Sequence, residues 1–164
     1  MPLTAGKNVK MVALSFGKTK RQLKFYTSLW AMMPHDQTGV VLPYEQICEM
    51  VAEAGYDGLA IDLGAGDVAQ ANAVRPHLER FGLTPLIVAF PKTINALEDT
   101  LLMAKDFGAP FVDVIGQVMP LSVDGMIPVI RKWIEMADQL DMPIQFETHR
   151  NCITNDLYAT LCLI

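Results

Sequence analysis

The chain has 164 residues, of which 51% are hydrophobic, so it is expected to form one domain with a substantial core and is not an intrinsically disordered protein. Six of its 13 basic residues precede position 25, and residues 25–164 then contain seven basic and 18 acidic residues. This acidic body argues against nucleic acid as a partner. No apolar run reaches the roughly 20 residues of a membrane helix, so no membrane span is expected.

The N-terminal segment is the most basic part of the chain. Residues 1–24 are predicted to be a poorly ordered basic extension. A targeting segment is the less favoured alternative, because the apolar stretch in this region is too short for a secretory signal. The three cysteines, Cys48, Cys152 and Cys162, are an odd number without CxxC spacing. They indicate neither a disulfide framework nor a zinc ribbon, and a cytoplasmic location is expected.

From Phe25 onward, short β-rich runs alternate with helical segments. The first predicted strand, 25–32, is followed by a long loop that contains His35 and Asp36, which are expected to be solvated. The next helix is expected to begin at Pro43 and to end at Gly55. Its apolar residues recur at helical spacing and predict one buried stripe, made by Ile47, Met50, Val51 and Ala54.

The same strand-and-helix unit then repeats. Four further strands are predicted at 58–63, 83–90, 111–117 and 143–149. A helix is expected after each of them, starting at Asp67, Thr93, Ser122 and near Thr154. Gly82 and Gly108 are expected to end the first two of these helices.

Repeated strand-helix units with right-handed connections predict a parallel sheet. Five such units fit either an open doubly wound sheet or part of an eight-stranded barrel. No GxGxxG phosphate-binding turn follows the first strand. Its absence from that position disfavours a dinucleotide-binding Rossmann domain.

The fifth predicted strand carries a polar row. The side-chain period of two places Gln145, Glu147 and His149 on one face. A buried carboxylate must be paired, hydrogen-bonded or bound to a metal, and active sites of barrels lie where their strands end. Glu147 and His149 are therefore candidate catalytic residues. The alternatives are an ion pair between Glu147 and Arg150 and a purely structural His149.

Four more residues near strand ends are candidate substrate-binding residues. Trp30 could form the apolar wall of a sugar pocket or belong to the core. Asp62 could be a ligand or a loop cap, and Gln117 could hydrogen-bond a substrate hydroxyl. Arg150 could bind a carboxylate or phosphate or be an ordinary surface arginine.

Two phrases carry a family resemblance. They are Ala-Gly-Tyr-Asp-Gly at 54–58 and Phe-Glu-Thr-His-Arg at 146–150, the second followed by Thr-Asn-Asp-Leu at 154–157. Over residues 25–164 the chain resembles the xylose isomerase-like TIM-barrel superfamily, most of all its sugar phosphate isomerase and epimerase branch. The resemblance implies an α/β fold, a partial (β/α)8 barrel of about five βα units. It also implies a sugar-like substrate and a divalent metal, Mn, Mg or Zn, with Glu147 as one ligand.

In that superfamily the other metal ligands come from strands six to eight, and this sequence has none of them. We therefore expect the N-terminal portion of a protein of about 250 to 330 residues, one that does not retain the metal and is inactive alone. Two alternatives are a non-catalytic half barrel that dimerises or binds a small ligand, and an endonuclease IV-like metal-dependent hydrolase. The three histidines of the chain are too few for the zinc cluster of that hydrolase.

Overall fold

The computed structural model describes residues 23–33, 39–118 and 122–163. The strands are β1 (Tyr26–Ser28), β2 (Gly58–Asp62), β3 (Thr84–Ala89), β4 (Val112–Val114) and β5 (Ile144–Phe146). The helices are the 3-10 helix η1 (Trp30–Met32), α1 (Tyr44–Glu53), α2 (Val68–Phe81), α3 (Ala96–Phe107), α4 (Val123–Leu140) and α5 (Leu157–Leu163). Most of the predicted N-terminal extension, and both His35 and Asp36, lie outside the described residues.

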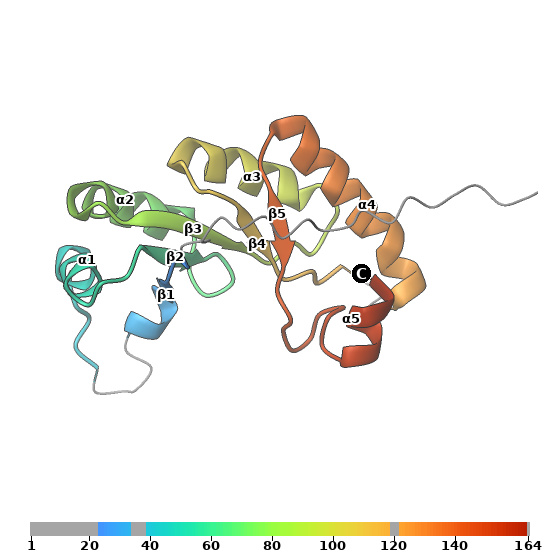
Figure 1. Ribbon diagram of the computed structural model, residues 1–164, viewed down its shortest axis with the longest axis horizontal. Helices are drawn as coiled ribbons and strands as arrows, with labels where there is room; N and C mark the ends of the chain where they lie inside the picture. Colours follow the sequence, from blue (N-terminus) through green and yellow to red (C-terminus); the bar gives the residue numbers. More distant parts are fainter. Residues whose placement is uncertain (1–22, 34–38, 119–121, 164) are drawn as a thin grey trace, which may run out of the picture.

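The five strands form one parallel sheet in the order β1-β2-β3-β4-β5. Each strand therefore lies beside its neighbours in sequence, whereas a doubly wound sheet reverses its order at a switch point. Figure 1 shows α1, α2, α3 and α4 following one another along the same side of the sheet. This sequential order with helices on one side is the arrangement of a barrel, so the predicted α/β partial TIM barrel is confirmed.

Alternate residues of the strands divide the core into two layers. Side chains such as Leu59, Ile61 and Ile87 are completely buried against the helices. The residues between them, among them Ala60, Leu86 and Val88, form a smaller cluster on the opposite face. Because side chains alternate along each strand, one face of the sheet packs against the helices and the other face can line a cavity.

The predicted helix ends are largely confirmed. The Asp67 side chain accepts a hydrogen bond from the Gln70 amide at 2.8 Å, and Gly82 and Gly108 end α2 and α3 with φ of 65° and 71°. The stripe predicted for α1 is partly wrong, because Met50 is 43% exposed and Ala54 is exposed. The face of α1 that packs on the sheet is instead made by Ile47, Cys48 and Val51.

The first, fourth and fifth strands are shorter than expected, and β4 ends at Val114 and not at Gln117. The Ser28 hydroxyl accepts a hydrogen bond from the Trp30 amide at 3.2 Å, so the chain turns into η1 and does not continue to residue 32 as a strand. β5 ends at Phe146, and the segment 147–156 forms a loop before α5. The last helix consequently begins at Leu157 and not near Thr154.

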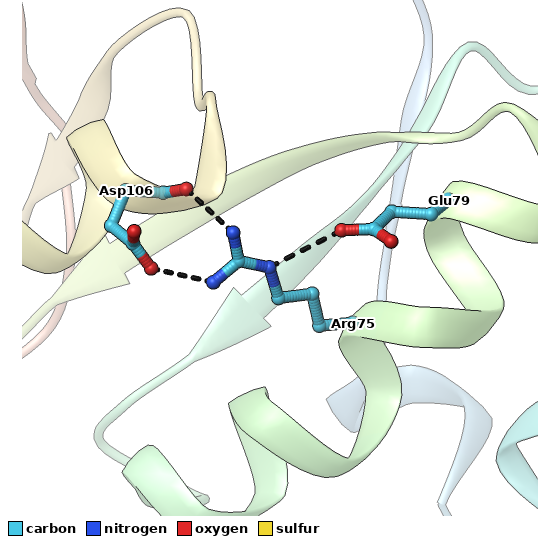
Figure 2. Close-up of polar contacts among 3 residues, drawn as sticks. All are labelled: Arg75, Glu79 and Asp106. Atoms are coloured by element: carbon cyan, nitrogen blue, oxygen red, sulfur yellow. Dashed lines mark hydrogen bonds and ion pairs between the residues drawn. The ribbon is translucent and has the colours of Figure 1, made fainter.

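The guanidinium group of Arg75 joins helices α2 and α3. Figure 2 shows Arg75 of α2 between Glu79 and Asp106: its Nε lies 3.3 Å from the Glu79 carboxylate and its Nη1 lies 2.5 Å from the Asp106 carboxylate. Its Nη2 also donates to the Asp106 backbone carbonyl at 2.8 Å. Because Asp106 lies in the last turn of α3, this contact fixes α3 against α2. No helix in the described part of the chain is long and apolar enough to cross a membrane.

Candidate active site

The face of the sheet opposite the helices encloses a cavity of about 340 Å3, which we name the inner cavity. Every strand or the loop after it contributes to its wall, through residues that alternate along the chain. The lining residues are Tyr26, Ser28, Trp30, Ala60, Asp62, Leu86, Val88, Phe90, Asp113, Ile115, Glu147 and His149. The polar members cluster where the parallel strands end, which is the position of active sites in TIM barrels.

Two carboxyl groups line the inner cavity, that of Asp113 in β4 and that of Glu147 directly after β5. Asp113 lies opposite Gln145 in the β4–β5 register, and the Glu147 amide continues that ladder by donating to the Val114 carbonyl at 3.1 Å. Burial, and then the negative charge of Glu147, raise the pKa of Asp113 to about 6. Asp113 Oδ1 is buried and has no hydrogen-bond partner among the described residues. A buried oxygen of this kind is available to a ligand.

The loop after β5 is anchored behind these groups. The Thr154 hydroxyl donates to the backbone carbonyl of Glu147 at 2.7 Å, and the Cys152 thiol donates to the carbonyl of His149 at 2.7 Å. Cys152, Ile153 and Thr154 are all buried. Buried side chains of the loop itself therefore hold the backbone from which Glu147 and His149 project.

The His149 ring has a defined orientation. It lies perpendicular to the Phe90 ring, with ring centroids 5.7 Å apart, and its Nδ1 lies 2.7 Å from the Arg150 carbonyl oxygen. Because a carbonyl oxygen only accepts, Nδ1 carries the proton in this contact. In the neutral ring, Nε2 is then an acceptor that a substrate hydroxyl can use.

The predicted site residues divide between two adjoining cavities. Trp30, Asp62, Glu147 and His149 line the inner cavity, and Trp30 is 52% exposed, so its assignment to the core is wrong. Gln117 and Arg150 do not line it. They line a second cavity of about 360 Å3, the mouth cavity, which is formed by Leu63, Gly64, Phe90, Lys92, Gln117, His149, Arg150 and Asn151. Phe90 and His149 belong to both cavities, so the two adjoin.

Hydrogen bonds and ion pairs bear on two alternatives considered from the sequence. Asp62 caps the loop after β2 through Oδ1, which accepts from the amides of Gly64 at 2.7 Å and Ala65 at 3.0 Å, and it also lines the inner cavity, so its role in substrate binding stays a prediction. Within the described ranges no ion pair joins Glu147 to Arg150. An ion pair with Arg150 therefore does not account for the position of Glu147.

Sequence reasoning did not select Asp113 as a site residue. Its sequence context could have identified it, because a charged residue between two apolar residues of a strand, here Val112 and Val114, lies on the opposite face from them. Lys92, in the loop after β3, was also missed. A lone lysine in a loop predicts no site until the fold is known to place it in the same cavity as Arg150.

The described residues do not form a complete metal site. Among residues 23–33, 39–118 and 122–163, no group of three or more His, Cys, Asp or Glu side chains could hold a metal ion. Glu147 and Asp113 supply two carboxylates, whereas Mg²⁺ and Zn²⁺ sites need more ligands than that. A bound metal would need ligands beyond these residues.

No protein family model and no curated protein matches the chain. Solved structures do. The chain is similar to YagE, a prophage protein of the dihydrodipicolinic acid synthase family from Escherichia coli, with 18% identity and a TM-score of 0.57 over 79% of this chain and 46% of that one. It is also similar to 3-dehydroquinate dehydratase from Geobacillus kaustophilus, with 19% identity and a TM-score of 0.50 over 75% of this chain and 49% of that one.

A third match is pyruvate carboxylase from Rhizobium etli, with 11% identity and a TM-score of 0.57 over 86% of this chain and 14% of that one. The fold is a partial TIM barrel. This chain spans about half the length of the first two structures. At these identities the likeness concerns the fold alone, and membership of the xylose isomerase-like superfamily stays a prediction.

Proposed function

We propose that this chain supplies part of the active site of an isomerase or epimerase acting on a sugar, a sugar phosphate or a related hydroxy-ketone. The observation that carries the proposal is the pair of carboxyl groups, Asp113 and Glu147, which line one cavity where neighbouring barrel strands end. Such reactions move a proton between adjacent carbons, or between the two faces of one carbon, next to a carbonyl group. Two carboxyl groups in one cavity are suited to remove and return that proton.

The pKa of Asp113 supports this role. A general acid or base works best when its pKa lies near the working pH, and Asp113, at about 6, is much closer to neutrality than an ordinary aspartate. In the proposal one carboxylate takes the proton from the substrate carbon and the other group of the pair donates. His149 accepts a hydrogen bond from a substrate hydroxyl through Nε2, and the exposed ring of Trp30 packs on the apolar face of the sugar.

A divalent metal, Mn, Mg or Zn, bound in part by Glu147, remains part of the proposal. Because the described residues do not complete its ligand set, the proton transfer above is assigned to the carboxyl groups alone. Metal analysis of a protein that contains this chain together with the remaining strands of the barrel tests this part separately, because this chain alone is not expected to retain the metal. About one metal per chain, lost in Glu147→Gln, supports ligation by Glu147, and metal content unchanged by that substitution contradicts it.

Proton exchange with solvent tests the proposed reaction directly. A protein that contains this chain together with the remaining strands of the barrel is incubated in D2O with a panel of aldoses, ketoses and their phosphates, and deuterium at the carbon next to the carbonyl is measured by NMR. We expect exchange with one member of the panel, and a rate about a hundredfold or more lower in Glu147→Gln and in Asp113→Asn. Glu49→Gln, at an exposed position of α1, is the control and should leave the rate unchanged. Full exchange activity in Glu147→Gln would refute the assignment.

A further inference from the structure

The mouth cavity differs in charge from the inner cavity. Lys92 and Arg150 line the mouth cavity together with the amide side chains of Gln117 and Asn151, and no acidic residue of the described part of the chain lines it. The carboxyl groups of Asp62, Asp113 and Glu147 all line the inner cavity instead. A molecule that occupies both cavities therefore meets positive charge at one end and carboxyl groups at the other.

Lys92 and Arg150 are two of the few basic residues in the acidic part of the chain. Residues 25–164 contain only seven basic residues against 18 acidic ones. Four of the seven are engaged elsewhere, in ion pairs or in a hydrogen bond to a backbone carbonyl: Arg75, Arg80, Lys105 and Lys132. Within the described ranges the side chains of Lys92 and Arg150 make no hydrogen bond or ion pair. Both are exposed at the mouth and free to bind an anion.

The segments that carry these groups are held in place. The backbone N–H of Gln117 donates to the backbone carbonyl of Pro91 at 3.1 Å. This bond joins the loop that contains Lys92 to the segment that follows β4. Arg150 and Asn151 lie between His149, whose carbonyl accepts from the Cys152 thiol, and the buried Cys152 itself. A positively charged cavity of about 360 Å3 with a fixed backbone is suited to a small ligand.

We propose that the mouth cavity binds the phosphate group of the substrate, with Lys92 and Arg150 as its ligands. Two cations and two amide donors suit a phosphate monoester, which carries up to two negative charges and three acceptor oxygens, better than a carboxylate with one charge and two oxygens. The sugar carbons then extend past Phe90 and His149 toward Asp113 and Glu147. The assignment of the phosphate to the substrate rests on the proposed function, whereas the anion site itself does not.

Inorganic phosphate is the probe for the test. It is titrated at pH 8.0 and constant ionic strength while the side-chain amide signals of Gln117 and Asn151 are followed by NMR. We expect saturable shifts of both signals, and affinity about tenfold or more weaker in Lys92→Ala and in Arg150→Ala. Arg131→Ala, at an exposed position of α4, is the matched control and should leave the affinity unchanged.

Three results would overturn the proposal: no saturable shift, an affinity that neither substitution alters, or acetate binding as tightly as phosphate. Glu147→Gln separates the two proposals, because it should abolish proton exchange while leaving phosphate affinity in place. Phosphate binding without proton exchange in any substrate would refute the proposed function and leave the anion site standing. Proton exchange without phosphate binding would refute the anion site alone.

Discussion

Replacing Asp113 by Asn should stabilise the protein at alkaline pH and have much less effect at acidic pH. Folding places the Asp113 carboxyl in the inner cavity beside Glu147, and this raises its pKa from 3.8 to about 6. A carboxyl with a raised pKa favours the folded state below the unfolded pKa, and that contribution is lost as the pH rises through about 6. Asparagine keeps the shape of the side chain but never has to ionise.

The magnitude follows from the change in proton affinity. A rise from 3.8 to about 6 makes proton binding roughly a hundredfold tighter, which corresponds to about 3 kcal/mol at full strength. Asp113 is only half-buried, so screening by solvent reduces this to about 1.5 kcal/mol. Most of that difference falls between pH 4.5 and pH 8.0. The gain in unfolding free energy from Asp113→Asn should therefore be about 1 kcal/mol larger at pH 8.0 than at pH 4.5.

Urea denaturation of both proteins at the two pH values measures this difference. Glu49→Gln, which changes an exposed carboxylate of α1, is measured in parallel and should show the same effect at both pH values. A gain from Asp113→Asn that does not depend on pH, or one that is larger at pH 4.5, would refute the placement of the two carboxyl groups in one cavity.

Three other substitutions test the packing that supports the site. Thr154→Val removes the hydroxyl that donates to the Glu147 carbonyl and should lower the unfolding free energy by about 1–2 kcal/mol in urea denaturation, whereas an unchanged value would show that the bond is absent. Gly58→Ala would place a Cβ 2.1 Å from the Thr84 carbonyl oxygen, so calorimetry should show a lower Tm and a loss of about 1–3 kcal/mol; a wild-type Tm would contradict this close approach. Trp133→Ala empties a fully buried position between α4 and the sheet and should cost about 3–5 kcal/mol in urea denaturation, while a cost below about 1 kcal/mol would contradict its burial.

Strand positions could be predicted closely from the sequence. Each strand begins within one residue of its predicted start, and the apolar runs of β2 to β5 follow glycine or proline in the sequence. The ends were harder to predict, since a strand stops where its neighbour no longer pairs with it. β1 shows this, as the Ser28 hydroxyl turns the chain after three paired residues.

Gln145, Glu147 and His149 were predicted to share one face of the fifth strand. Glu147 and His149 do line the inner cavity, although they lie after the end of β5, whereas Gln145 is exposed and does not line it. Asp113 and Lys92 were not predicted as site residues. Each is a single charged residue, and its place in a site depends on residues from another strand or loop. Alternation within one strand identifies a face. It does not identify which charged residues of neighbouring strands will meet there.

The most direct test of the carboxyl pair is a titration of Asp113 by carbon-13 NMR of its side-chain carboxyl group. We predict a pKa of about 6 in the wild-type protein, and a lower value in Glu147→Gln, because the neighbouring charge is removed. An Asp113 pKa that is the same in both proteins would contradict the pairing of the two groups in one cavity.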